Sequence, residues 1–269
     1  MVRSRSAGLL AGHVCVVTGG ASGMGAACVQ LFAEESAKAV AILDMQPPTE
    51  SVVSEARKSG CDILTFMLDV TDRDAIDRAI DCVWMSYGAV DSAANCAGIT
   101  GTKAVLSSYP VDDWQRVLDV NLTGVFHCMQ AELRVMLRQG RGAVVNVSSA
   151  ASVHPPPELG AYAASKSALV GLGRSAAGDY AGRNIRINTV LPGLVETPML
   201  MSSGNREDEA ASDAMARLSR SSPMGRVGRP VEVANAIAWL LSDNASYVHG
   251  VDLLVDGGAH AFSPAVVAR

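Results

Sequence analysis

The sequence predicts an α/β protein built on a doubly wound parallel sheet with helices on both faces. Short apolar runs alternate with longer helical stretches along the 269 residues, and such alternation is typical of a parallel sheet covered by helices. A glycine-rich segment, residues 18–25, follows the first apolar run and opens a helical stretch. The length suits one such domain. We therefore expect a single domain over residues 1–269, with short tails at 1–9 and 259–269.

The expected elements follow one another with few interruptions. Gly60 and Gly88 stand where two of the helices should end, and residues 71–74 have the composition of a helix start. No internal repeat or linker separates the elements. We expect strands at 13–18, 39–44, 63–68, 90–94, 143–148, 185–191 and 251–255, and helices from the glycine-rich turn to about 35 and at 49–59, 71–87, 111–138, 160–182 and 230–242.

Composition and charge exclude several functional classes. Hydrophobic residues make up 49% of the chain, aromatic residues 4%, and there are 25 glycines, which is the composition of a tightly packed protein. The net charge of −5 gives no electrostatic reason to bind nucleic acid or an anionic membrane. No apolar run reaches the roughly 18 residues of a membrane-spanning helix, and the N-terminus resembles a short tail more than a signal peptide. We expect no nucleic-acid and no membrane partner.

The cysteines and histidines indicate neither disulfides nor a metal. Six cysteines are scattered through apolar surroundings without a Cys-x-x-Cys pair, so we expect free thiols in a reducing, cytoplasmic setting. The five histidines are equally dispersed and show no metal-ligand spacing. A zinc-dependent alcohol dehydrogenase is therefore poorly supported, and we expect no metal.

The glycine-rich turn, Thr18-Gly19-Gly20-Ala21-Ser22-Gly23-Met24-Gly25, is typical of a dinucleotide site. Glycines let the backbone approach a pyrophosphate, and the following helix N-terminus supplies free N–H groups. Asp44 ends the next strand, 19 positions after Gly25, near the offset at which an acid binds the adenosine ribose. A carboxylate there would repel a 2′-phosphate, and the turn holds no arginine or lysine. This favours NAD over NADP, although Asp44 could also be a surface residue that caps a turn.

Tyr162 and Lys166 are candidates for acid–base chemistry. Residues four apart on a helix are neighbours on one face, and a nearby positive charge lowers the pKa of a phenol from its usual ~10. Ser149 follows an apolar run, so its hydroxyl is expected at the carboxyl end of a strand, where open α/β sheets bind ligands. Each residue alone could be structural: a half-buried tyrosine, a solvated lysine and a helix cap. Asn121, inside an apolar helix, is either satisfied locally or placed for function.

Taken together, these residues resemble the short-chain dehydrogenase/reductase family, whose fold is a single Rossmann-type domain. The resemblance covers residues 10–258, and only the Cys96 of Asn95-Cys96-Ala97-Gly98 departs from a common family pattern. Any one match is weak, but the whole set in this order is specific. The matching residues are 18–25, Asp69, Val70, Asn95, Ala97, Gly98, Asn121, Ser149, Tyr162, Lys166, Pro192, Gly193, Thr197 and 256–258.

The resemblance implies a role for each of these positions. Tyr162 would be the acid/base, Ser149 would orient the substrate oxygen, Lys166 would hold the nicotinamide ribose and lower the tyrosine pKa, and Asn121 would support a water linked to Lys166. The family's spacing selects Ser149 over Ser148. Residues implied to bind the cofactor, NAD, are Gly19, Ser22, Gly23, Met24, Gly25, Asp44, Asp69, Val70, Asn95, Ala97, Gly98, Tyr162, Lys166, Pro192, Gly193, Val195 and Thr197.

The substrate is less well determined by the sequence. Residues 150–159, rich in proline, and a charged helical lid at about 199–223 should wall the pocket, and the apolar start of the lid at Met199 favours a hydrophobic secondary alcohol or ketone. A 3-oxoacyl thioester reductase is the alternative enzyme, and a non-catalytic nucleotide-sensing protein is the alternative outside enzymes. The resemblance also implies a homotetramer.

Overall fold

The computed structural model describes residues 8–204, 211–220 and 222–261. Its centre is a seven-stranded parallel sheet in the order β3-β2-β1-β4-β5-β6-β7, which confirms the predicted doubly wound sheet. The chain runs outward from β1 in one direction and then returns to β4, so the strand order reverses between β1 and β4. The strands are β1 (Val14–Thr18), β2 (Ala39–Asp44), β3 (Asp62–Met67), β4 (Ser92–Asn95), β5 (Gly142–Val147), β6 (Ile185–Pro192) and β7 (Asp252–Val255).

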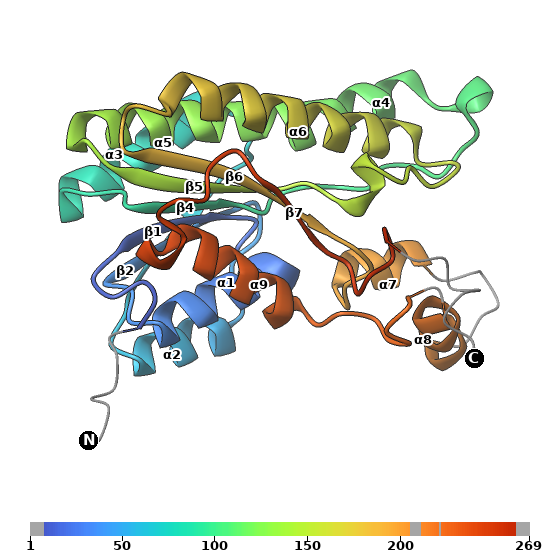
Figure 1. The fold of residues 1–269 in the computed structure, drawn as a ribbon, viewed down its shortest axis with the longest axis horizontal. Coiled ribbons are helices and arrows are strands. Elements are labelled where there is room, and N and C mark those ends of the chain that lie inside the picture. The colour runs from blue at the N-terminus through green and yellow to red at the C-terminus, as the bar shows by residue number, and fades with distance from the viewer. Residues whose placement is uncertain (1–7, 205–210, 221, 262–269) are drawn as a thin grey trace.

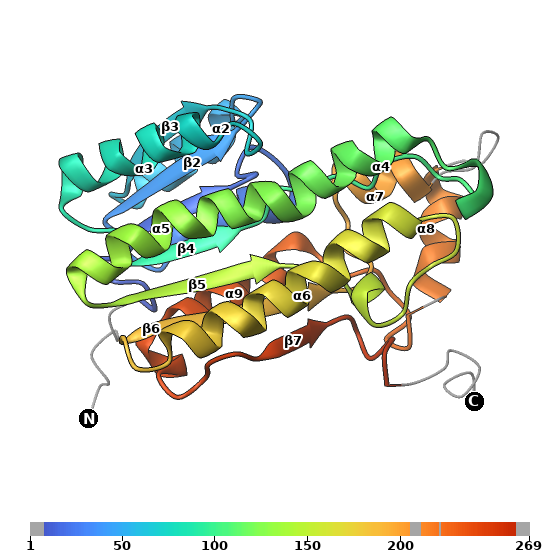
Figure 2. The same cartoon turned by 90° about the horizontal axis from the view of Figure 1, so that it is seen from above.

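Helices cover both faces of the sheet (Figure 1). One layer packs α3, α4, α5 and α6 together, and the opposite layer packs α1 between α2 and α9. Two further helices, α7 and α8, lie beyond the carboxyl ends of the strands (Figure 2). The helices are α1 (Gly23–Glu34), α2 (Glu50–Lys58), α3 (Arg73–Tyr87), α4 (Val111–Leu118), α5 (Val125–Gln139), α6 (Gly160–Tyr180), α7 (Pro198–Gly204), α8 (Ala211–Arg220) and α9 (Pro230–Leu241).

Each helical layer packs against one face of the sheet and forms a separate hydrophobic core with it. All five residues of β1 are buried, as expected for a strand covered on both faces. Successive side chains point to opposite faces of a strand, so Cys15 and Val17 join the core under α1 and α9, whereas Val14 and Val16 join the core under α3, α5 and α6. The apolar runs of the sequence therefore reflect two buried faces.

Most predicted elements are found within a few residues of their expected ends, and the helix starts and stops have the predicted chemistry. Asp72 caps α3 by accepting a hydrogen bond from the amide of Ala75 at 3.0 Å, and Gly88 ends the same helix in the left-handed conformation. All six cysteines are free thiols, as expected. No helix among the described residues has both the length and the apolar character needed to cross a bilayer.

Two expected elements differ in detail. The helix predicted over 111–138 is divided by a π-helical turn at Asp119–Gly124, which carries Asn121 and separates α4 from α5. The predicted lid contains α7 and α8 instead of one helix, and its charged segment 206–209 lies outside the described residues. The described part of the C-terminal tail, 259–261, turns back toward the carboxyl end of the sheet, where it lines a cavity described below.

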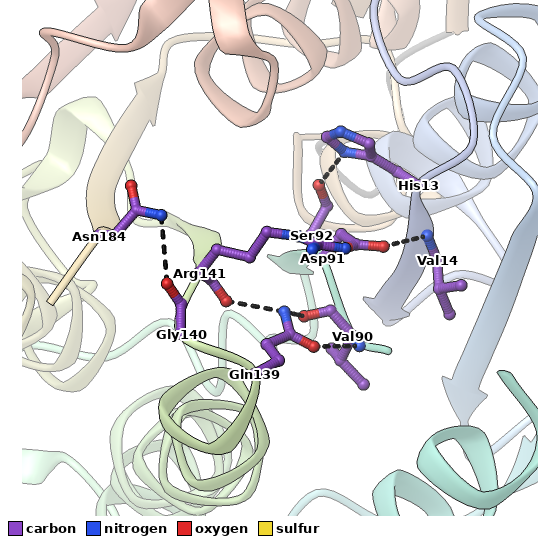
Figure 3. A network of polar contacts seen from close by, with 9 residues as sticks. All are labelled: His13, Val14, Val90, Asp91, Ser92, Gln139, Gly140, Arg141 and Asn184. Atoms are coloured by element: carbon purple, nitrogen blue, oxygen red, sulfur yellow. Dashed lines mark hydrogen bonds and ion pairs between the residues drawn. The ribbon is translucent and has the colours of Figure 1, made fainter. Parts of the chain in front are cut away.

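Polar side chains fasten the opposite, amino end of the sheet (Figure 3). Asp91 precedes β4 and accepts hydrogen bonds from the amide of Val14 at 3.0 Å and from the guanidinium of Arg141 at 2.8 Å. Gln139 pairs with both backbone groups of Val90, at 3.1 and 2.8 Å. These contacts tie β1, β4 and the start of β5 to one another, and so they fix the strands whose other ends form the candidate site.

Candidate active site

The turn between β1 and α1 brings backbone into close contact with backbone. Gly19 has a φ of 66°, and a Cβ on it would lie 2.8 Å from Ala97. A Cβ on Gly25 would lie 2.1 Å from the carbonyl oxygen of Gly19. Only glycine can occupy either position without moving the main chain. The result is a narrow backbone cradle in front of the N-terminus of α1, which is a general anion-binding arrangement.

This cradle is part of a groove of 320 Å³ across the carboxyl ends of β1, β2 and β4. The groove lies where the strand order reverses, which is where open α/β sheets bind their ligands. Most residues predicted to bind the cofactor line it together: Gly19, Ser22, Gly23, Met24, Gly25, Asp44, Asp69, Val70, Ala97, Gly98 and Thr197. Residues that the sequence did not single out also line it, among them Met45, Gln46, Leu68 and Cys96.

Asp44 stands at the edge of this groove with its carboxylate held by backbone. One oxygen accepts a hydrogen bond from the amide of Ala21 at 3.0 Å, and the other accepts from Gln46 at 2.9 Å. The contact with Ala21 joins the end of β2 to the glycine-rich turn. A negative charge is thereby fixed beside the cradle, which is the geometry expected of a carboxylate that accepts hydroxyl donors and repels phosphate.

Asn95 is placed differently from the other cofactor residues. Its side chain is fully buried and donates hydrogen bonds to Glu132 on α5 and to Asn146 on β5, each at 3.1 Å. The groove-lining residues are its neighbours Cys96, Ala97 and Gly98. Asn95 therefore contributes to the groove only by anchoring the backbone of the residues that follow it. Its side-chain amide points toward α5.

Tyr162 and Lys166 lie on successive turns of α6, as their spacing predicts. The ammonium nitrogen of Lys166 is 5.9 Å from the centre of the Tyr162 ring and donates a hydrogen bond to the carbonyl of Val147 at 2.9 Å. Lys166 is buried, with 4% of its surface exposed. Ser148 fixes this part of the helix, because its hydroxyl donates to the backbone carbonyl of Lys166 at 2.7 Å. Ser148 is thus a structural residue.

The ionisation of this pair differs from the expectation. Burial raises the pKa of Tyr162, and the only opposing influence is a hydrogen bond with Ser149, which lowers that pKa. Burial lowers the pKa of Lys166 to about 8, against a small raising effect of Cys96. No effect of Lys166 on the pKa of Tyr162 is found in this structure, where burial sets the direction of the shift and the ammonium donates to the carbonyl of Val147; the influence of Lys166 on the phenol stays a prediction.

Ser149 is both a cap and a partner of Tyr162. It follows β5 and caps a short 3-10 turn, with its Oγ accepting a hydrogen bond from the amide of Ala151 at 3.1 Å. Ser149 also lies close enough to Tyr162 to lower the pKa of its phenol. The structural and functional interpretations of Ser149 are therefore compatible, since the capping bond fixes the hydroxyl beside the phenol.

Asn121 connects the π-helical turn to the centre of the site. Its side chain accepts from the amide of Ile99 at 2.8 Å and donates to the carbonyl of Ile99 at 2.8 Å and to Ser165 at 3.0 Å. A Cβ on Gly98 would lie 3.2 Å from the Asn121 oxygen and 3.3 Å from the Lys166 ammonium. The fold therefore brings Gly98, Asn121 and Lys166 together although they come from three different elements.

A second cavity, of 610 Å³, adjoins the groove and contains Tyr162 and Ser149. The two cavities share Met24, Thr197 and Met199. Residues 150–159 and the start of α7 form two walls, as the sequence predicts, and the other cofactor candidates, Pro192, Gly193 and Val195, also line it. A third wall, formed by Asp256, Ala259, His260 and Ala261, was missed, although the Asp256-Gly257-Gly258 motif marked its start.

A phosphate-binding cradle, an acid at the end of β2 and a Tyr–Lys–Ser set beside an apolar cavity define a class: dinucleotide-dependent oxidoreductases of the Rossmann type. No group of three or more His, Cys, Asp or Glu side chains suited to a metal ion occurs within the described ranges.

Comparison with known proteins gives the family. The family model described as Enoyl-(Acyl carrier protein) reductase matches residues 19–260. The chain is 41% identical over 249 residues to 3-oxoacyl-[acyl-carrier-protein] reductase FabG of Thermotoga maritima, covering 93% of this chain and 98% of the relative. It is 41% identical over 246 residues to cis-4-hydroxycyclohexanecarboxylate dehydrogenase of Sinomonas cyclohexanicum, covering 91% and 96%.

A solved structure shares the architecture. Carveol dehydrogenase from Mycobacterium avium in complex with NAD has a TM-score of 0.89 and 29% identity, covering 95% of this chain and 100% of that chain. The protein belongs to the short-chain dehydrogenase/reductase family, a family of oxidoreductases, as the sequence motifs predicted.

Proposed function

We propose that this protein is an NAD-dependent oxidoreductase that interconverts a hydrophobic secondary alcohol and its ketone. The observation that supports it best is that Tyr162 and Ser149 line the same mostly apolar cavity, which adjoins the dinucleotide groove. A phenol and a serine hydroxyl placed together can both bind one substrate oxygen, and the phenol can exchange a proton with it.

The groove fits a dinucleotide. The cradle that a Cβ on Gly19 or Gly25 would fill suits a pyrophosphate, and Asp44 would accept the hydroxyls of the adenosine ribose. Asp69 and Val70 would flank the adenine, and Thr197 and Val195 would hold the carboxamide. The nicotinamide ring supplies a site that accepts or donates hydride. Asp44 and the absence of lysine and arginine from residues 18–25 favour NAD over NADP.

The chain's own residues handle the proton. Tyr162 would take the hydroxyl proton during oxidation and return it during reduction, while Ser149 orients the substrate oxygen. The buried ammonium of Lys166 would hold ribose hydroxyls and stabilise negative charge that develops on the phenol. Asn121, fixed by Ile99 and Ser165, would support a water molecule through which protons pass between Lys166 and solvent.

The cavity favours a hydrophobic, ring-sized substrate. Its lining includes Leu159, Leu194 and Pro156, and the start of α7 adds Met199 and Leu200. Two proteins that the chain resembles carry names of cyclic-alcohol dehydrogenases, those acting on cis-4-hydroxycyclohexanecarboxylate and carveol. A cyclic secondary alcohol is the class that we propose. By resemblance to the family, we also propose a homotetramer in the cytoplasm, which light scattering and fractionation would test.

A 3-oxoacyl thioester reductase is the second candidate. The 41% identity to the Thermotoga maritima enzyme favours it. The carboxylate of Asp44 disfavours NADPH, the cofactor that such a reductase normally uses. A non-catalytic nucleotide-binding protein is less well supported, because Ser149, Tyr162 and Lys166 are all present and clustered.

The deciding experiment follows NADH absorbance with NAD or NADP and a panel of cyclic secondary alcohols, beside Tyr162→Phe. We expect turnover with NAD and a loss of at least about 100-fold in kcat/KM in the variant, the usual range for a general acid–base group. Turnover with NADP alone, together with reduction of 3-oxoacyl thioesters, would favour the second candidate. NADH binding without turnover of any alcohol or ketone would favour the non-catalytic one.

A further inference from the structure

We propose that His154 and His260 form a second substrate-binding point, which accepts a carboxylate or carbonyl oxygen on the part of the substrate away from the reacting carbon. This inference rests on the proposed function and makes it more specific. It describes a substrate with two oxygen functions, one at Tyr162 and one at the two imidazoles.

The two histidines meet at the mouth of the cavity that contains Tyr162. His154 belongs to the segment between β5 and α6, and His260 belongs to the segment that follows β7, yet their ring centres are 4.7 Å apart at an angle of 46°. Both side chains are exposed and both line the 610 Å³ cavity. Two walls far apart in sequence thus contribute one imidazole each to the same rim.

The backbone holds both residues in place. The amide of His154 donates to the carbonyl of Ala150 at 2.8 Å, and the amide of His260 donates to the carboxylate of Asp256 at 2.7 Å. The other oxygen of Asp256 accepts from the amide of Gly258 at 2.9 Å. In contrast, no hydrogen bond between either imidazole ring and another described residue is found. The rings are therefore positioned by the main chain, and their nitrogens are available to a ligand.

Other polar side chains of this cavity are already engaged or belong to the reaction. Ser148 donates to the carbonyl of Lys166 at 2.7 Å, Thr197 donates to the carbonyl of Val195 at 3.3 Å, and both oxygens of Asp256 accept backbone amides. Ser149 and Tyr162 would bind the reacting oxygen under the proposed function. Apart from Thr100, the polar side chains left to bind a second substituent are the two histidines.

The chemistry of imidazole sets the class of group that fits. Each ring presents at least one N–H donor in any protonation state, so two facing rings offer two donors to one group. A carboxylate or a carbonyl oxygen accepts two such bonds, whereas a hydrocarbon substituent accepts none. An enzyme built to bind an oxygen in this way discriminates against analogues that lack it.

The test compares three alcohols with NAD: 4-methylcyclohexanol, 4-hydroxycyclohexanone and a hydroxycyclohexanecarboxylate. We expect the native enzyme to favour one of the two oxygen-bearing alcohols over the methyl compound by about 10-fold in kcat/KM, the order expected for one net hydrogen bond. His154→Phe and His260→Phe keep a ring of similar size without the nitrogens, and each should reduce that ratio toward 1. His154→Gln, which keeps a donor, should restore part of it. Tyr247→Phe, an exposed residue at the amino end of the sheet, serves as the control and should leave the ratio unchanged.

A binding measurement separates this inference from the proposed function. Binding of cyclohexanecarboxylate, which has no carbinol to oxidise, is measured by calorimetry with NADH present, and we expect about 10-fold weaker binding in the phenylalanine variants. Turnover of all three alcohols without preference, or a preference that survives in the double phenylalanine variant, would overturn the second binding point. Absence of turnover with unaltered carboxylate binding in the variants would overturn both proposals, whereas absence of turnover with histidine-dependent binding would overturn the function alone.

Discussion

The two ends of the parallel sheet have cavities of nearly equal size and different chemistry. At the amino end a cavity of 590 Å³ is lined by His13, Asp91, Arg141, Arg186 and His249, and at the carboxyl end lies the 610 Å³ cavity with Tyr162. Volume alone would therefore not identify the candidate active site. The two cavities differ in what their polar side chains bind.

At the amino end the polar side chains bind the fold itself. Arg141 pairs with Asp91, which also holds the amide of Val14 (Figure 3). Arg186 donates to the carbonyls of Leu240 and Ser242 at 2.6 and 3.0 Å. Groups satisfied in this way have little capacity left for a ligand, and their role is to hold strands and helices together.

At the carboxyl end, burial changes the ionisation of two polar groups. Burial raises the pKa of Tyr162 and lowers that of Lys166, so the fold disfavours the charged form of each. Such groups are typical of functional sites. We therefore expect substitutions at the carboxyl end to alter kinetics and substitutions at the amino end to alter stability. The following experiments test this expectation.

The largest effect is expected for Lys166→Met, which removes the buried ammonium but keeps a long side chain. We expect kcat/KM to fall by at least about 100-fold, because the charge that stabilises the phenolate is lost. Stability should not fall, since a charge that burial disfavours is removed. Lys166 should contribute a rise in native stability with pH between about 8 and 10.5, its folded and ordinary pKa values, because its amino group binds more protons in the unfolded chain there, while the raised pKa values of buried thiols such as Cys15 and Cys128 oppose that rise.

The variant should lack that rise, which thermal melts over this pH range would measure. A variant with normal kcat/KM would remove Lys166 from the mechanism. An equal pH dependence of stability in the native enzyme and the variant would show that the lysine is not desolvated as the structure has it.

Asp44→Asn tests the charge at the edge of the groove. The amide can still accept hydroxyl donors but no longer repels a 2′-phosphate, so we expect the ratio of kcat/KM for NAD to that for NADP to fall by roughly 10- to 100-fold, about 1.4 to 2.7 kcal/mol. Asp62→Asn, which alters a carboxylate on the neighbouring strand β3 away from the groove lining, is the matched control. An unchanged ratio would mean that another feature sets the cofactor preference.

Asp91→Ala tests the amino end. It removes the partner of the buried amide of Val14 and of Arg141, and an unsatisfied buried donor costs about 1–3 kcal/mol. We expect the free energy of unfolding in urea to fall by that amount, with kcat/KM within two-fold of the native value. Asp112→Ala, at an exposed position on α4, should change stability by less than about 0.5 kcal/mol. A large fall in kcat/KM with normal stability would contradict the division between the two ends.

The sequence predicted the sheet, the helices and the glycine-rich groove well, because each depends on local patterns. Fully apolar runs such as Val14–Thr18 are buried on both faces, and the spacing of Tyr162 and Lys166 fixes their positions on one helix. The contacts of Gly19 and Gly25 also follow from local turn geometry. These features need no knowledge of what packs around them.

The features that sequence reasoning missed depend on distant segments. The pKa shifts of Tyr162 and Lys166 arise from burial by several elements, whereas a helix spacing reports only their mutual distance. The contact between His154 and His260 joins segments about 100 residues apart, and nothing in either segment alone indicates it. Asn95 was assigned to the cofactor by the family resemblance, but its side chain donates to Glu132 and Asn146.

Glu132 provides the finest test, because it lies beneath the carboxyl end of the sheet without lining either cavity. It is fully buried, and burial raises its pKa to about 7 from an ordinary 4.5, against the lowering effect of its bond with Asn95. Between those two pH values the folded protein binds more protons than the unfolded chain, so stability should fall as pH rises through this window. Glu132→Gln keeps the shape and an acceptor for Asn95 but cannot ionise. We expect it to remove this pH dependence and to raise the free energy of unfolding above pH 7 by on the order of 2 kcal/mol.

Glu34→Gln, exposed on α1, should leave the dependence unchanged. Urea unfolding at pH 5 to 8 measures the slope; an equal slope in Glu132→Gln would show that other groups cause it, and a loss of kcat/KM in that variant would extend the functional end of the sheet to α5.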